Sequence, residues 1–265
     1  MRTRGLKRKG GEFKGRPLPL QRKNRPPAAF PRAPYYNVPH MPAPERSAVS
    51  QAPEARVFSP LDLALRQLDR TIRTVVGAHG SHRPNPARDI AETVAADADR
   101  RHVIGLMRIN HSGEIAAQAL YHGQALTAQG AATRDSMVSA AQDETDHLAW
   151  CAERIHELGG HRSALVPLWY LGSFAIGALA GLAGDRASLG FVAETERQVV
   201  RHLDSHLRQL PNGDARTRAI LEQMSSDEAR HGHDAKLAGG MELPAPIRAL
   251  MTLTSKVMTK SAYWI

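Results

Sequence analysis

The sequence predicts an all-α protein with a four-helix bundle at its centre, and three observations lead to this prediction. From Phe58 onward, apolar residues recur at spacings of three and four, which is typical of amphipathic helices. Clusters of Gly, Pro and Asn divide this part of the chain into segments of helical length. No stretch shows the sustained period-two alternation between hairpin turns that indicates strands.

The expected helices follow in order along the chain. The first covers residues 58–76, opens after Ser59 and Pro60, and is ended by the sequence GAHGSHRPNP. Four longer helices are expected at residues 99–128, 134–158, 187–210 and 215–237. They end at QGAAT, at Gly159 and Gly160, at PNGD, and at Gly239 and Gly240. These four segments are long enough to form the bundle.

Residues 1–56 differ in composition from the rest of the chain. They carry 13 Lys and Arg against 3 acidic residues, and most of the prolines, whereas the remainder carries 22 basic and 23 acidic residues. We expect residues 1–56 to form a disordered basic, Pro-rich extension and residues 57–265 to form the folded domain. An organelle targeting sequence is the alternative for the extension. Because the folded part is nearly neutral, we expect no nucleic-acid partner.

Two further segments are candidates for contact with a membrane. Residues 163–184 contain no charged side chain and place Gly177 and Gly181 in a GxxxG pattern, so they could lie in lipid or form a buried helix at a bundle interface. Residues 247–265 mix Leu, Met and Val with Arg and Lys and carry Tyr263 and Trp264 near their end. This last segment is either an interfacial amphipathic helix or a helix packed on the bundle.

The pattern Glu-x-x-His occurs three times and is the strongest chemical signal. DETDH contains Glu144 and His147, and DEARH, on a later helix, contains Glu228 and His231. Because the Glu and the His are three residues apart on a helix, their side chains lie on the same side of it and can bind one metal ion. The third pair, Glu153 and His156, begins nine residues after Glu144 and so lies on the opposite side of the same helix, where a solvated face is expected.

Each of the two informative pairs follows a glutamate on the preceding helix. Glu114 precedes Glu144 in this way, and Glu196 precedes Glu228 at a nearly equal separation along the chain. In an antiparallel hairpin such residues can face one another, so two packed hairpins bring four Glu and two His into the bundle core. This donor set is typical of di-iron and di-manganese carboxylate proteins. The six predicted ligands are Glu114, Glu144, His147, Glu196, Glu228 and His231.

Several neighbours of the predicted ligands are candidates for supporting roles. Asp143 and Asp146 could orient ligating imidazoles or face water, and His202 could bond a ligand or substrate or be an ordinary polar position. Tyr121, seven residues after Glu114, is a further candidate to lie near the ligands. Cys151, the only cysteine, is expected to pack as a small buried hydrophobe rather than to bind metal.

These motifs resemble the Coq7 family, the demethoxyubiquinone hydroxylases of ubiquinone biosynthesis. The resemblance rests on RINHSGEIAAQALYHGQAL, QDETDHLAWC, PLWYLGSFAIGALAGLAG, AETERQVV and DEARHGHDA, and it covers residues 58–265. It implies a ferritin-like fold with additional membrane-interacting helices and two iron ions bound by the six predicted ligands. Glu144 and Glu196 are then the candidates to bridge both ions. It also implies an O2-dependent monooxygenase that hydroxylates the ring of a polyprenylated demethoxyubiquinol.

The implied partners follow from this chemistry. The electrons would come either from the quinol itself or from an external reductant such as NADH, and the sequence has no GxGxxG fingerprint for a nicotinamide site of its own. A single membrane span at residues 163–184 would separate the two halves of the metal site, so we expect a peripheral protein on the cytoplasmic face of a bacterial cell membrane. The matrix face of the mitochondrial inner membrane is the alternative. A homo-oligomer or association with other quinone-biosynthesis proteins is also expected.

Other function classes share parts of this pattern. A ferritin-type iron store would use the carboxylate bundle without needing the uncharged segment, and a di-iron hydroxylase of tRNA would need a basic folded surface. A structural membrane protein would bind no metal.

Overall fold

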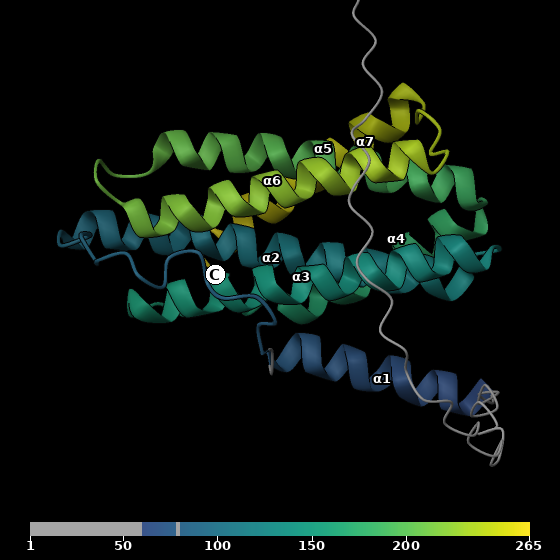
Figure 1. Ribbon diagram of the computed structural model, residues 1–265, viewed down its shortest axis with the longest axis horizontal. Helices are drawn as coiled ribbons and strands as arrows, with labels where there is room; N and C mark the ends of the chain where they lie inside the picture. The colour runs from purple at the N-terminus through teal and green to yellow at the C-terminus, as the bar shows by residue number, and fades with distance from the viewer. Residues whose placement is uncertain (1–59, 78–79) are drawn as a thin grey trace, which may run out of the picture. The chain divides into compact units, whose positions relative to one another are not determined.

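The computed structural model describes residues 60–77 and 80–265, and this part of the chain contains seven helices and no strand (Figure 1). The predicted all-α class is therefore confirmed. The predicted disordered extension at residues 1–56 lies outside the described residues, as does the beginning of the first predicted helix.

The helices begin and end close to the expected positions. They are α1 (Pro60–Val76), α2 (Asp97–Thr127), α3 (Ala131–Glu157), α4 (Val166–Leu182), α5 (Asp185–Gln209), α6 (Ala215–Leu237) and α7 (Ala245–Ala262). The start of α3 differs most from its expected position, because the chain turns helical directly after Gly130 and includes the two alanines of QGAAT. Gly159 and Gly239 adopt φ values of 76° and 100° after α3 and α6, a backbone conformation that favours glycine.

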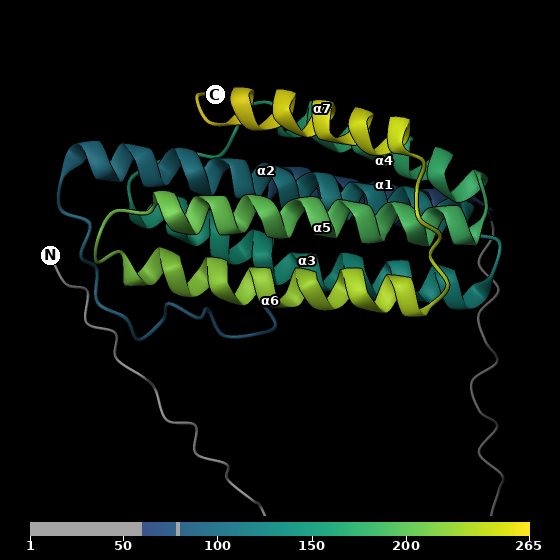
Figure 2. The ribbon, with the colours of Figure 1, turned by 90° about the horizontal axis from the view of Figure 1, so that it is seen from above.

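Four of the helices form the bundle. Helices α2 and α3 pack together as one hairpin, α5 and α6 as the other, and the hairpins meet through α2 with α5 and α3 with α6 (Figures 1 and 2). Helix α4 lies between the two hairpins in sequence and packs on α2, so it forms the long crossover of a ferritin-like bundle. Helix α7 returns along α2 and α5.

The bundle core has an apolar layer at each end and a polar layer between them. One apolar cluster includes Leu106, Trp150, Leu203 and Met224, and the other includes Tyr121, Met137, Val192 and Ala235. On each of the four helices the predicted ligands come between residues of the first cluster and residues of the second. The antiparallel arrangement therefore brings all the ligand-bearing turns to one level.

Helix α4 presents two different faces. Its buried residues are Val166, Tyr170, Gly177 and Gly181, whereas Leu168, Leu171, Leu179 and Leu182 are exposed. The predicted segment 163–184 is thus packed along one side and open along the other. No helix among the described residues combines the length and the apolar character needed to cross a bilayer.

Helix α7 is exposed to a similar degree. Only Ala262 is buried in it, while Leu250, Leu253 and Val257 are each more than half exposed. The C-terminal segment is therefore packed on the bundle along one edge and also carries an exposed apolar surface. It has features of both alternatives that the sequence allowed, a helix packed on the bundle and an interfacial amphipathic helix.

Close contact between α2 and α4 depends on glycine. A Cβ atom on Gly177 would lie 2.2 Å from the backbone oxygen of Leu120, and a Cβ atom on Gly123 would lie 2.2 Å from the backbone oxygen of Phe174. Both neighbours are backbone atoms, which cannot turn aside as a flexible side chain can. The GxxxG pattern of α4 therefore serves helix packing within this chain.

Replacing Gly177 with alanine is expected to force α4 away from α2. Overpacking of this kind costs about 1–3 kcal/mol, which corresponds to a fall in melting temperature of about 2–4 °C per kcal/mol for a domain of this size. Gly172→Ala is the matched control, because no atom lies within 4 Å of the Cβ position there and the same helix gains an alanine. Thermal unfolding followed by circular dichroism measures both variants. Equal melting temperatures for the two would contradict the close contact.

Candidate metal centre

The six predicted ligands meet in the polar layer of the bundle. Helix α2 supplies Glu114, α3 supplies Glu144 and His147, α5 supplies Glu196, and α6 supplies Glu228 and His231. All six are buried, and the most exposed of them, His231, is 9% exposed. Side chains from both hairpins thus converge on one enclosed site.

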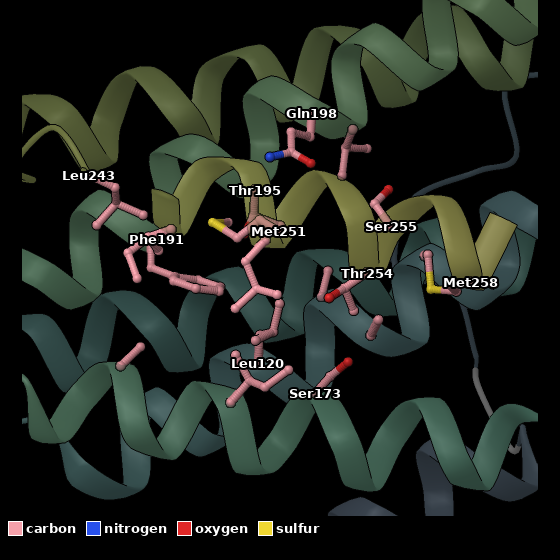
Figure 3. Close-up of a pocket in the computed structure, with 18 of the residues that line it drawn as sticks. Leu120, Ser173, Phe191, Thr195, Gln198, Leu243, Met251, Thr254, Ser255 and Met258 are labelled. Atoms are coloured by element: carbon pink, nitrogen blue, oxygen red, sulfur yellow. The ribbon is translucent and has the colours of Figure 1, made fainter. Parts of the chain in front are cut away.

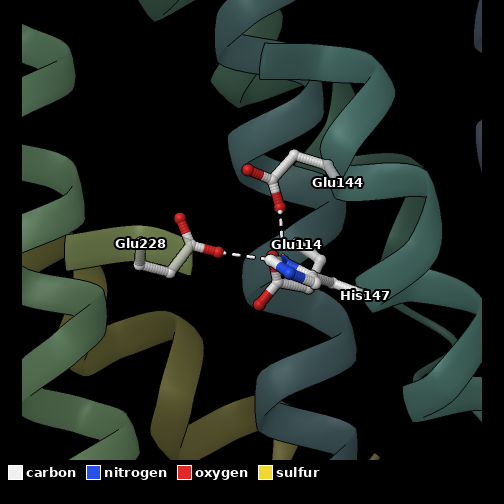
Figure 4. A group of neighbouring side chains, drawn as sticks. All are labelled: Glu114, Glu144, His147 and Glu228. Atoms are coloured by element: carbon white, nitrogen blue, oxygen red, sulfur yellow. Dashed lines mark hydrogen bonds and ion pairs between the residues drawn. The ribbon is translucent and has the colours of Figure 1, made fainter. Parts of the chain in front are cut away.

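Each imidazole faces the carboxylates with its Nδ1 atom. Nδ1 of His147 lies 2.9 Å from a carboxylate oxygen of Glu228, 3.3 Å from one of Glu144 and 3.7 Å from one of Glu114 (Figure 4). Nδ1 of His231 lies 3.2 Å from Glu228 and 3.8 Å from Glu144. The donor atoms are close enough together to bind a common ion.

The donors form two overlapping groups. We call them the His147 position (Glu114, Glu144, His147 and Glu228) and the His231 position (Glu144, Glu196, Glu228 and His231), and within each group one donor atom per residue lies within 4.8 Å of every other. Each group could hold a metal ion, and together the two groups contain all six ligands predicted from the sequence.

The residues common to both groups differ in part from the two carboxylates expected to bridge the ions. Glu144 and Glu228 belong to both groups, whereas Glu196, expected to bridge, belongs only to the His231 position. The grouping therefore favours Glu228 beside Glu144 as the shared carboxylate, in place of Glu196. The reason is geometric. Glu144 and Glu228 come from α3 and α6, the two helices that also carry the imidazoles. Glu114 and Glu196 come from the other two helices, α2 and α5, and each belongs to one group only.

The electrostatics of the cluster favour bound cations. Burial, together with repulsion from Glu228 and Glu114, raises the pKa of Glu144 well above its ordinary value, and burial with repulsion from Glu228 also raises the pKa of Glu196. Among the described residues, no Lys or Arg forms an ion pair with any of the four glutamates, and both carboxylate oxygens of Glu196 are buried without a hydrogen-bond partner. Buried carboxylates without a cationic side chain beside them are costly unless bound cations neutralise them, so the donor set fits divalent metal ions.

The other ring nitrogen of each imidazole is bound by an aspartate from the opposite half of the site. Nε2 of His147 donates to Asp227 at 3.1 Å, and Nε2 of His231 donates to Asp143 at 3.1 Å. The aspartate of each Asp-Glu-x-x-His sequence thus orients the histidine of the other. This leaves Nδ1 of both rings free to face a metal.

Asp227 was missed by the sequence reasoning, although the repeat contained a signal for it. Asp143 was a candidate imidazole partner, and Asp227 occupies the equivalent place in the second pentapeptide. Asp146, a candidate either to orient an imidazole or to face water, does neither: it is buried and accepts from the backbone N–H of His82 at 2.6 Å and from Nε of Arg83 at 2.7 Å. It faces outward from the ligands on α3, toward the segment that precedes α2.

The remaining candidates lie around the site in different ways. Tyr121 is buried in one apolar layer of the core. His202 is partly buried, has its Nε2 3.0 Å from the hydroxyl of Ser255, and lines the apolar cavity described below. Cys151 is fully buried in the other apolar layer, as expected of a packing residue. Glu153 and His156 are exposed, which confirms the interpretation of the third pair as a solvated face.

An apolar cavity leads to the metal ligands. It has a volume of about 630 Å³ and is lined by residues of α2, α4, α5 and α7 (Figure 3). Glu114 also forms part of its wall. Several other lining residues are exposed, among them Ile176, Leu179 and Leu250, so the cavity opens at the surface between α4 and α7. A largely apolar molecule could therefore reach the cluster from the side on which these two helices expose their leucines.

Comparison with known proteins points to one family. The profile described as ubiquinone biosynthesis protein COQ7 matches residues 101–262. The chain is 59% identical over 208 residues to the 3-demethoxyubiquinol 3-hydroxylase of Cupriavidus taiwanensis, an alignment that covers 77% of this chain and 100% of the relative. It is 54% identical over 215 residues to the protein of that name from Xanthomonas oryzae pv. oryzae, covering 81% of this chain and 99% of the relative.

Proposed function

Because the chain belongs to the COQ7 family of ubiquinone biosynthesis proteins, we propose that it is a 3-demethoxyubiquinol 3-hydroxylase whose six clustered ligands hold two iron ions. The observation that carries the proposal is the buried group of four glutamates and two histidines, one of which, Glu114, lines an apolar cavity that opens at the surface. The donor set suits a pair of iron ions, since carboxylates and one imidazole per ion are typical of di-iron proteins.

The reaction replaces a ring C–H bond of the quinol by C–OH. One oxygen atom of O2 enters the ring, and the other leaves as water after two electrons and two protons arrive from an external reductant. The iron pair, when bound, supplies the activation of O2 that no side chain can provide. The contribution of the protein is to hold the ions at fixed separation, to place the ring beside them and to exclude bulk water.

Each part of the site has its own task in this proposal. Glu114, Glu144, Glu196 and Glu228 would hold the ions together with His147 and His231, and Asp227 and Asp143 keep the imidazoles in the tautomer and orientation that this requires. The wall of the cavity is apolar apart from a few hydroxyl and amide groups, so it suits a substituted aromatic ring with an isoprenoid tail. The ring would lie at the inner end beside Glu114, and the tail would run outward between α4 and α7.

The exposed apolar residues at the mouth of the cavity support peripheral attachment to a membrane. Helices α4 and α7 both expose leucines, and α7 adds Arg248, Lys256 and Lys260 without any acidic residue. A helix of this kind lies in the interface of a bilayer containing anionic lipids. A polyprenyl quinol resides in the same bilayer, so the substrate could enter the cavity without crossing water. The relatives come from bacteria, which favours the cytoplasmic face of the cell membrane.

The activity is tested with purified protein of measured iron content. Demethoxyubiquinols with a short and with a long prenyl tail are supplied with ¹⁸O2 and a chemical reductant, and the products are analysed by mass spectrometry. We expect one ¹⁸O atom in the ring of the hydroxylated product from both quinols. Iron-loaded, reduced protein that converts neither quinol would overturn the proposal, and uptake of far more than two iron ions per chain would point to storage instead.

A further inference from the structure

The two imidazoles of the metal centre have different supports. Asp227, which binds His147, has a side chain that is 3% exposed, whereas Asp143, which binds His231, has a side chain that is 46% exposed. The hydrogen bond between His147 and Asp227 is therefore shielded from water. At the hydrogen bond between His231 and Asp143, water competes with the imidazole for the aspartate. Since both imidazole–aspartate contacts measure 3.1 Å, the difference lies in what surrounds the aspartates.

Asp227 is bound from several sides. Nη1 of Arg83 donates at 2.8 Å to Oδ2, the same carboxylate oxygen that accepts from His147. The other oxygen, Oδ1, accepts from the side chain of Gln223 at 3.2 Å and lies 3.2 Å from the guanidinium of Arg230. In the described part of the chain, Asp143 has no ion pair besides that with His231.

Arg83 is itself held in place. Its Nε donates at 2.7 Å to Asp146, and its guanidinium carbon lies 4.9 Å from the ring centroid of Trp150. The preceding backbone is fixed as well, because the N–H of His82 donates to Asp146 at 2.6 Å. The planar guanidinium therefore joins a carboxylate on α3 to one on α6.

This arrangement makes the surroundings of the two metal positions unequal. At the His147 position, the imidazole is held by a buried aspartate that an arginine ties to the neighbouring helix. At the His231 position, it is held by a half-exposed aspartate that, among the described residues, forms no ion pair with an arginine. Partners of this kind change metal affinity by about 10–100-fold when they are lost, because they fix the orientation and basicity of the ligand.

We propose that Arg83 is a positioning residue that makes the two metal positions unequal, so that the His147 position binds a divalent metal more tightly than the His231 position. The inference rests on the two-metal site of the proposed function. Arg83 contacts no metal donor atom that faces the cluster, and it acts through Asp227 and the imidazole ring.

Cobalt(II) titration of the metal-free protein tests this proposal. Visible absorption and calorimetry report each bound ion, and we expect two steps for the unaltered protein, the first at least about tenfold tighter than the second. Arg83→Gln should weaken the first step by about 10–100-fold and leave the second almost unchanged. Arg83→Lys, which keeps the charge but cannot join two carboxylates with a planar fork, should restore part of the loss.

Two further variants assign the steps. His147→Ala should remove the tighter step, and His231→Ala the weaker one. Circular dichroism melts of each metal-free variant show whether it is folded, and the two-step titration of the unaltered protein tests the inequality even if an Arg83 variant does not fold. Two equal steps in the unaltered protein, or an unchanged first step in folded Arg83→Gln, would overturn the inference while leaving the hydroxylase intact. Failure to bind any metal would overturn the two-metal site as well.

Discussion

Replacing Glu228 with alanine is expected to remove both metal ions and to lower the rate of hydroxylation by at least about 10³-fold, because this carboxylate belongs to both metal positions. Glu196→Ala should behave differently. Glu196 belongs only to the His231 position, so this variant should retain about one ion per chain. Elemental analysis of the purified, iron-loaded variants gives the metal content, and product formation gives the rate.

The third Glu-x-x-His sequence supplies the matched control for this prediction. Glu153→Ala removes a glutamate from the same kind of sequence on the same helix as Glu144, but at an exposed position where it accepts from Asn85 at 2.7 Å. Metal content and rate should equal those of the unaltered protein. If Glu228→Ala keeps two ions, or if Glu196→Ala loses as many as Glu228→Ala, the assignment of the shared carboxylates is wrong.

The double variant Leu253→Asp and Val257→Asp is expected to weaken binding to vesicles by about 100-fold. Both side chains lie on α7, are more than half exposed, and do not line the cavity. Each would otherwise bury apolar surface in the bilayer interface, a contribution of about 1 kcal/mol or more for a half-exposed side chain, and each new carboxylate would be repelled by anionic lipid. Sedimentation with vesicles of phosphatidylethanolamine and phosphatidylglycerol measures the bound fraction.

An equivalent change elsewhere on the surface distinguishes membrane contact from a general effect of added charge. Leu237, on α6, is 73% exposed and lies outside the surface formed by α4 and α7. Leu237→Asp should bind vesicles as the unaltered protein does. Equal loss in both variants, or no loss in either, would contradict attachment through α7. Retained melting temperature and metal content show that the substitutions have not disturbed the bundle.

Much of the fold could be predicted because the apolar spacing and the turn residues act locally. The helix that ends before Gly159 and the helix that ends before Gly239 were placed correctly at their ends, since glycine tolerates the positive φ that closes a helix and other residues rarely do. The start of α3 was placed too late, because alanines after Gly130 carry no strong boundary signal. The segment at residues 163–184 was recognised as apolar, but its division into a packed and an exposed face depends on which helix it meets.

The sequence by itself determined the membership of the polar cluster: helical spacing and two hairpins suffice to bring Glu114, Glu144, His147, Glu196, Glu228 and His231 to one level. Only the tertiary structure decided which carboxylates are shared, that Asp227 and Asp143 cross between the two halves, and that Arg83 supports one imidazole and not the other. The physical reason is that the spacing of residues along a helix determines on which face of the helix a side chain lies and how far along the helix axis it is. The distances between side chains on different helices depend instead on how the helices pack and on where a connecting segment is anchored.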